Sequence, residues 1–144
     1  MLLAAIHPEL YAARWWVMQT LREDDEVLDL HEVLEHWHSI FMAITLITNR
    51  ESPLHRDPKT NISWYDLTLT IGKYDEVILE LSTFGVRLLY NSGSICFISR
   101  KLIHHSISST NGRRICYVYY MRESMHKFYS LSLARWVKYK DVEL

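Results

Sequence analysis

Apolar positions along the chain change their spacing after about residue 42, and this change predicts where helices give way to strands. Over residues 8–22, apolar side chains recur every three or four positions, as on one face of an α-helix. Pro8 suits the first turn of that helix. The same spacing predicts a second helix over about 26–41, so the N-terminal part, about 8–41, is expected to be helical.

Short β-prone runs separated by glycine and asparagine turns follow from residue 43. In residues 64–71 the side chains alternate between two faces, which indicates a strand. Strands are expected over about 43–48, 64–71, 77–82, 86–90, 94–99, 102–108 and 114–121. A last helix is predicted over about 123–137.

Two helices followed by about seven short strands favour an α+β protein built on a double-stranded β-helix, the cupin-like jelly-roll barrel. The N-terminal helices are expected to pack on one of its sheets. A chain of 144 residues suits one core, so residues 1–144 are interpreted as a single domain with a barrel core over about 43–122.

Composition excludes several other classes. No run approaches the roughly 18 uncharged apolar residues of a membrane span, and residues 1–8 lack the basic start of a signal peptide. Cys96 and Cys116 lie in apolar runs and lack the C-x-x-C spacing. They are therefore predicted to be free thiols in a reducing, intracellular compartment.

The net charge of −1 conceals an asymmetry. Residues 1–96 carry 7 basic and 14 acidic side chains, whereas residues 97–144 carry 9 basic and 3 acidic ones. This basic third either attracts phosphates or forms an ordinary solvated surface. If it binds nucleic acid, a basic rim is expected round a pocket, formed by Arg100, Lys101, Arg113, Arg122 and Lys127.

A His-x-Asp step, His55 and Asp57, is the main candidate for chemistry. In extended backbone these side chains point to the same side, so both can ligate one ion. Two histidines and one carboxylate can hold a metal and leave its opposite face open, as in non-haem Fe(II) oxygenases. For the second histidine, strand parity favours His105 over His104, because His105 shares its face with two flanking isoleucines. Three ligands without a fourth indicate a catalytic rather than a structural site.

Arg114 follows the Asn111-Gly112 turn, and a hairpin there would return it beside the strand of His105. A guanidinium in a small apolar interior needs an anionic partner, because an unpaired buried charge is costly. The carboxylate of a 2-oxo acid would be a bidentate partner. In the alternative interpretation, His55 and Asp57 are loop residues, His105 is a core histidine and Arg114 pairs with an acidic side chain.

The stretch from Trp37 to His126 resembles the 2-oxoglutarate/Fe(II) dioxygenase domain of the TET/J-binding-protein family, especially its fungal members. The matching phrases are WHSIF at 37–41, TNR at 48–50 leading into HRD at 55–57, WYD at 64–66, TIGKY at 70–74, YNSG at 90–93, GRRIC at 112–116 and YYMR at 119–122. Their order along the chain is more specific than any single phrase.

This resemblance implies an enzyme that binds Fe(II) and uses 2-oxoglutarate and O2. The implied iron ligands are His55, Asp57 and His105. Arg114 would bind the distal carboxylate of 2-oxoglutarate, while Arg50 matches a position near the co-substrate and Asn49 is a further candidate for lining that site.

The resemblance also implies a substrate, a methylated nucleic-acid base, with 5-methylcytosine in DNA as the first candidate and a nuclear location. Tyr120 matches a position that stacks on the target base, Arg122 matches a polar position beside it, and Asp66 is a further candidate for lining the site. A base in duplex DNA would have to flip out of the stack. Two alternatives stay open: the same chemistry on N6-methyladenine, RNA or a small molecule, and an inactive barrel that serves as an interaction module.

Three positions depart from the family pattern, namely His104, Ser106 and Arg113. They bear on substrate and activity more than on fold. The oligomeric state is left open by the sequence.

Overall fold

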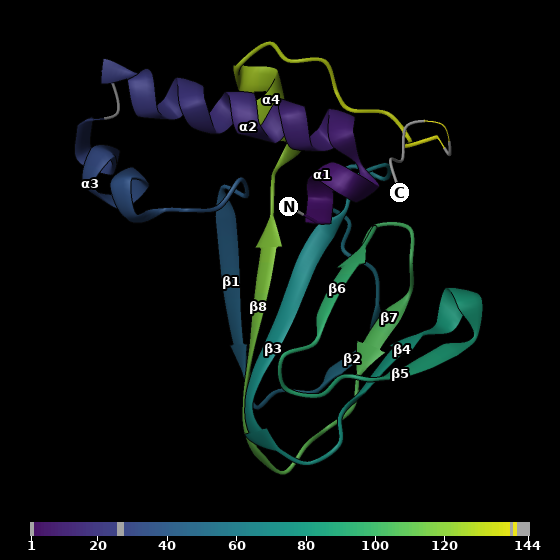
Figure 1. Ribbon diagram of the computed structural model, residues 1–144. Helices are drawn as coiled ribbons and strands as arrows, with labels where there is room; N and C mark the ends of the chain where they lie inside the picture. The colour runs from purple at the N-terminus through teal and green to yellow at the C-terminus, as the bar shows by residue number, and fades with distance from the viewer. Residues whose placement is uncertain (1, 26–27, 139, 141–144) are drawn as a thin grey trace. The chain divides into compact units, whose positions relative to one another are not determined.

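The computed structural model describes residues 2–25, 28–138 and 140. The chain forms two compact units: a helical unit made of Met1–Met42 and Met121–Leu144, and a barrel unit made of Ala43–Tyr120 (Figure 1). The boundary at residue 43 coincides with the change in apolar spacing along the sequence. The packing of the helices on one sheet stays a prediction, as does the single-domain organisation.

The helical unit contains α1 (Leu2–Ile6), α2 (Pro8–Glu23), α3 (Leu28–His36) and α4 (Glu123–Phe128). α2 begins at Pro8 as predicted, and the His7 side chain caps it by accepting a hydrogen bond from the Leu10 N–H, at 3.3 Å. Its buried face carries Val17, Met18 and Leu21, which form a cluster with Leu34 of α3. None of the described helices is long and apolar enough to cross a membrane.

Two helix predictions extend too far, and α1 was not predicted. The helix predicted over 26–41 ends at His36, and residues 26–27 lie outside the described residues. Beyond His36 the indole N–H of Trp37 donates to the Phe41 carbonyl at 2.7 Å, which fixes a turn. The helix predicted over 123–137 ends at Phe128, and Ser130 then adopts a left-handed conformation (φ 53°), which ends helices.

The barrel unit consists of two four-stranded antiparallel sheets (Figure 1). One sheet has the order β1 (Ala43–Thr48), β8 (Gly112–Tyr120), β3 (Asp66–Tyr74), β6 (Ile95–Ile98). The other has the order β2 (Ser52–His55), β7 (His105–Ile107), β4 (Ile78–Leu81), β5 (Val86–Leu89), with the short 3-10 helix η2 (Ser82–Phe84) between β4 and β5. The predicted jelly-roll fold is confirmed.

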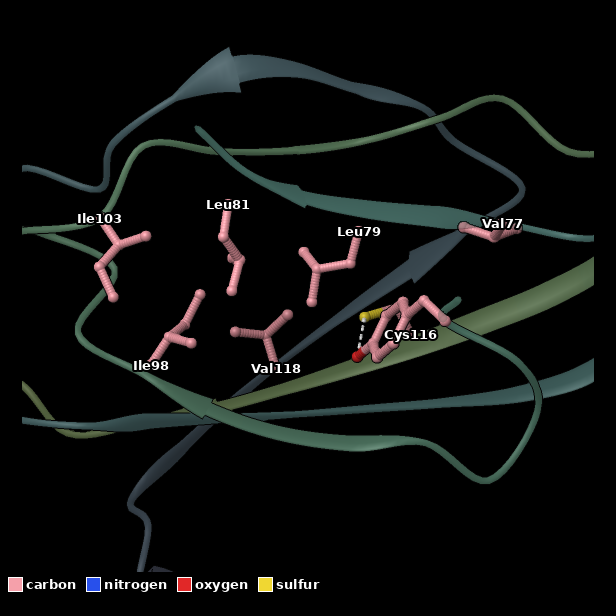
Figure 2. Close-up of a cluster of buried hydrophobic side chains, with 8 residues drawn as sticks. Val77, Leu79, Leu81, Ile98, Ile103, Cys116 and Val118 are labelled. Atoms are coloured by element: carbon pink, nitrogen blue, oxygen red, sulfur yellow. Dashed lines mark hydrogen bonds between the residues drawn. The ribbon is translucent and has the colours of Figure 1, made fainter. Parts of the chain in front are cut away.

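The inner faces of the two sheets form the barrel core. Figure 2 shows Leu79 and Leu81 of β4 facing Ile98 of β6 and Val118 of β8, and all four side chains are buried. The predicted alternation of β3 is present, but its inner face is the polar one, with Thr70 fully buried. The Thr70 hydroxyl lies 3.1 Å from the Tyr74 hydroxyl, so this buried polar group is satisfied. Cys96 and Cys116 are free, as predicted.

The predicted hairpin between the strands of His105 and Arg114 is wrong. β7 pairs with β2 and β4, whereas β8 pairs with β1 and β3, so the two strands lie in different sheets. The Asn111-Gly112 turn instead lies beside the end of β3, where the Asp75 N–H donates to the Asn111 carbonyl at 3.0 Å and Gly112 pairs with Tyr74. The segment between β7 and β8 therefore carries the chain from one sheet to the other.

β2 was not predicted as a strand. It is four residues long, contains Pro53, and its register with β7 shifts between Ser52 and His55. A proline lacks the N–H of a ladder hydrogen bond and is tolerated at a sheet edge, which is where β2 lies. The strand predicted over 102–108 is likewise shorter, His105–Ile107.

Candidate metal centre

The three predicted metal ligands come together at one end of the β2–β7 pair. His55 ends β2 and lies opposite His105, the first residue of β7, with ring centroids 4.3 Å apart. Asp57 follows two residues later, with its Oδ1 3.5 Å from the Nε2 of His55. One ligand atom from each of the three residues lies within 4.8 Å of the others, which is close enough for one ion to contact all three.

Backbone carbonyls fix the form of both imidazoles. The Nδ1 of His55 lies 2.7 Å from the Pro53 carbonyl, and the Nδ1 of His105 lies 2.9 Å from the Ile103 carbonyl. A carbonyl only accepts, so each Nδ1 carries the hydrogen, and Nε2 of the neutral ring is left as a lone-pair donor. Burial, and secondarily the charge of Arg100, lowers the pKa of His105, which favours this neutral form.

His104 lies apart from this group. The Nε of Arg56 lies 2.9 Å from the Nε2 of His104. Arg56, which follows His55, thus pairs with His104, which precedes His105. Of the two adjacent histidines, the structure brings His105 to His55 and Asp57. Strand parity in the sequence favours the same residue.

Arg100, in the turn between β6 and β7, is part of the site; the sequence placed it only among the residues of a possible basic rim and did not predict its contact with Asp57. Its Nη2 lies 2.9 Å from the Oδ2 of Asp57, and its Nε donates to the Nε2 of His105 at 3.3 Å. Nothing local in the sequence distinguishes it from the other basic residues of the C-terminal third. Arg113 is exposed and precedes the inward-facing Arg114 on the same strand, so it points to the opposite face. Arg100 contacts Asp57 and His105, whereas Arg113 points to the other face of β8. These two members of the predicted basic rim therefore do not lie side by side.

Arg114 points into the barrel from β8 and is 1% exposed. Its backbone N–H donates to the Oδ1 of Asn49 at 2.7 Å, and its Nη2 donates to the Arg50 carbonyl at 2.8 Å. Asn49 and Arg50 thus hold Arg114 in place. Its Nε and Nη1 are buried without a hydrogen-bond partner, and no acidic side chain within the described residues pairs with it. The predicted alternative of an acidic partner is therefore not seen in that part of the chain.

One cavity lies between the two histidine candidates, His55 and His105, and this guanidinium; Asp57 is beside the histidines but is not part of the cavity wall. Its polar walls come from Ser52, His55, Thr68, Tyr90, Arg100, His105 and Arg114. Its apolar walls come from Ile47, Leu79, Ile98, Ile107, Cys116 and Val118. Tyr90 was not predicted as a site residue; burial raises the pKa of its phenol, which therefore remains a hydrogen-bond donor.

The side chains of this cavity, together with Asp57 beside it, have the chemistry to bind a metal ion and a dianionic ligand. Imidazole nitrogens with one carboxylate and open positions suit Fe(II). The unpartnered buried nitrogens of Arg114 require an anion, because an unpaired buried charge is strongly unfavourable. An organic acid that chelates the metal and carries a second carboxylate would satisfy both ends of the cavity.

Three further predicted residues do not line the cavity. Tyr120 ends β8 on the face of Arg114 and packs against the barrel core. Asp66 begins β3 on its inner face and is 1% exposed. Arg122 belongs to the helical unit, where it is exposed at the residue before α4.

Comparisons with known proteins bear on the fold and the family of this chain. A solved structure of NgTET1 in complex with 5mC DNA is similar, with a TM-score of 0.54 and 13% identity over 80% of this chain. The match covers 49% of the NgTET1 chain, so this chain spans about half of that protein, and at this identity the likeness concerns the fold alone. A cupin 2 conserved barrel domain protein from Salinispora arenicola CNS-205 aligns with a TM-score of 0.38 at 11% identity, over 65% of this chain and 76% of that one, too weakly to support an argument. No curated protein sequence matches significantly.

The sequence model of the Tet/JBP family, described as the oxygenase domain of the 2OGFeDO superfamily, matches residues 1–123. This range includes the whole barrel unit and every residue of the cavity. The chain therefore belongs to the Tet/JBP family of the 2OGFeDO superfamily, whose dioxygenases use Fe(II), 2-oxoglutarate and O2.

Proposed function

We propose that this dioxygenase hydroxylates a methyl group on a nucleic-acid base, 5-methylcytosine in DNA above all. His55, Asp57 and His105 hold Fe(II), and Arg114 pairs with the distal carboxylate of 2-oxoglutarate. One observation carries the proposal: His55 and His105, which have ligand atoms within 4.8 Å of an Asp57 oxygen, line a cavity that also contains a buried, partly unpartnered guanidinium.

Fe(II) with 2-oxoglutarate and O2 supplies the oxidising power that hydroxylates an unactivated methyl C–H bond. The chain's own residues provide binding and orientation. The two carbonyl-bound Nδ1–H groups aim the Nε2 atoms of His55 and His105 at the metal. The apolar walls lower the local dielectric constant, which strengthens the pairing between Arg114 and a carboxylate.

Support for the base substrate comes from the family and from the NgTET1 structure, which contains 5mC DNA. In the proposed complex the target nucleotide is flipped out of the duplex, and Tyr120 stacks on its base. The resemblance to the family also implies a role near the base for Arg122 and for Asp66, although neither residue lines the cavity. Because the proposed substrate is DNA, the proposal includes a nuclear location for the protein.

The test is product analysis by mass spectrometry. The protein, with Fe(II), 2-oxoglutarate and O2, is incubated with matched oligonucleotides that contain 5-methylcytosine or N6-methyladenine, as DNA and as RNA. The expected products are 5-hydroxymethylcytosine in DNA and an equal amount of succinate. Asp57→Ala should abolish both, whereas His104→Ala, a change beside a ligand candidate but outside the group, should retain most of the activity.

Other outcomes point to the alternatives. Turnover of N6-methyladenine or RNA in place of 5-methylcytosine would keep the iron chemistry and replace the substrate. Succinate formation without any nucleic-acid product would indicate a small-molecule substrate. A wild-type protein that binds neither metal nor 2-oxoglutarate would leave only the interaction module.

A further inference from the structure

Arg100 is attached to Asp57 at two points. Its side-chain Nη2 lies 2.9 Å from the Oδ2 of Asp57, and its backbone carbonyl accepts a hydrogen bond from the Asp57 N–H at 3.0 Å. The Arg100 side chain is 12% exposed and the Asp57 side chain 30% exposed, so the pair is partly shielded from solvent screening. These contacts fix the rotation of the Asp57 carboxylate.

The two oxygens of that carboxylate have different neighbours. Oδ1 lies 3.5 Å from the Nε2 of His55, a neighbouring ligand candidate, while Oδ2 pairs with Arg100. Asp57 therefore presents one oxygen to a metal. A carboxylate without such a partner can bind an ion through both oxygens.

The number of ligating oxygens matters for this chemistry. With one atom from each of three residues, an octahedral ion keeps three open positions. A chelating 2-oxo acid needs two of them and O2 needs the third. A second oxygen from Asp57 would compete for one of these positions.

We propose that Arg100 is a positioning residue that restricts Asp57 to a single ligating oxygen and thereby keeps the metal open to the chelating 2-oxo acid. This inference rests on the proposed metal-binding role of His55, Asp57 and His105. The Arg100 side chain also contacts His105, and that contact is compatible with this role. The hydrogen bond from the Arg100 Nε to the His105 Nε2 would break when that nitrogen binds a metal. The ion pair with the Asp57 Oδ2 would persist, because in this proposal the metal binds Asp57 through Oδ1 alone.

The experiment separates metal binding from 2-oxo acid chelation. Co(II) affinity is measured from the visible spectrum of the Co(II) protein. Chelation is measured without oxygen, by titrating 2-oxoglutarate into the Fe(II) protein and following the visible band of the chelate. The variants are Arg100→Ala and Arg100→Lys, and Lys101→Ala is the matched control because it removes the same charge from the next residue.

In Arg100→Ala, Co(II) should bind about as tightly as in the wild type. The Kd for 2-oxoglutarate should rise about 10-fold or more, equivalent to about 1.4 kcal/mol, because the freed second oxygen of Asp57 then competes with the chelate for one position. Arg100→Lys supplies a new donor for Oδ2 and should recover most of the loss. Lys101→Ala should match the wild type in both titrations.

Unchanged chelation in Arg100→Ala would overturn the inference, and so would a parallel loss of Co(II) and 2-oxoglutarate binding, which a purely structural role predicts. If Arg100→Ala does not fold, Arg100→Met, which keeps much of the side-chain volume, is judged by the same two criteria. A wild-type protein that binds no Co(II) would instead refute the proposed function.

Discussion

Replacing Arg114 with glutamine tests the far end of the cavity. In the structure, the Nη2 of Arg114 already donates to the Arg50 carbonyl, while Nε and Nη1 are buried and unpartnered. Two donors are thus available to a carboxylate, and each hydrogen bond to a charged group contributes about 1.5–3 kcal/mol. Taking the lower value for each donor, because the ligand carboxylate must also be desolvated, the loss is about 3 kcal/mol, or about 150-fold in Kd.

The assay compares two ligands on the Fe(II) protein without oxygen. One is 2-oxoglutarate, and the other is 2-oxopentanoate, which carries a methyl group where 2-oxoglutarate has its distal carboxylate. Binding of both to the wild type and to Arg114→Gln completes a double cycle that isolates the guanidinium–carboxylate interaction. Arg113→Gln, the preceding residue on the opposite face of β8, is the matched control and should bind both ligands as the wild type does.

The result that would refute the reasoning is equal weakening of both ligands by Arg114→Gln. Arg114 would then act only by supporting the cavity walls. Weaker 2-oxoglutarate binding in Arg113→Gln as well would assign the effect to net charge rather than to the buried guanidinium.

Two other predictions concern stability, measured by urea unfolding with tryptophan fluorescence. Gly72 has φ +136°, and a Cβ there would lie 2.0 Å from the Arg113 carbonyl oxygen, so Gly72→Ala should cost about 3 kcal/mol or more. Gly93→Ala (φ +90°), where a Cβ meets nothing within 4 Å, should cost only about 1–2 kcal/mol, and equal costs would contradict the argument. Burial, with the nearby charge of Arg14, lowers the pKa of His126 to about 4 from an ordinary 6.5. The unfolded chain therefore binds the proton first, so stability should fall by up to about 3 kcal/mol as the pH drops from 6.5 to 4. His126→Gln should flatten this part of the pH profile, and a profile identical to that of the wild type would show that another group titrates.

Local pattern in the sequence was enough to predict much of the barrel. The alternation in residues 64–71 predicts β3, and the change in apolar spacing predicts the start of the barrel at residue 43. The same period of two predicts which of His104 and His105 faces inward, and it places Arg114 on the inner face of β8. These features depend only on a side chain's position within its own strand.

Contacts between segments far apart in the chain were decided by the tertiary structure. Arg114 reaches the cavity from the sheet opposite β7 and not through a hairpin, although local turn residues favoured one. Arg100 joins Asp57 across 43 positions of sequence, and no periodicity within either segment encodes that pairing. Strand alternation specifies which face a residue occupies, but the partner across the barrel depends on how the sheets are ordered and closed. The sequence by itself therefore determined the elements, their inward faces and the candidate ligands, while the fold determined which of them share a cavity and which cation lies beside Asp57.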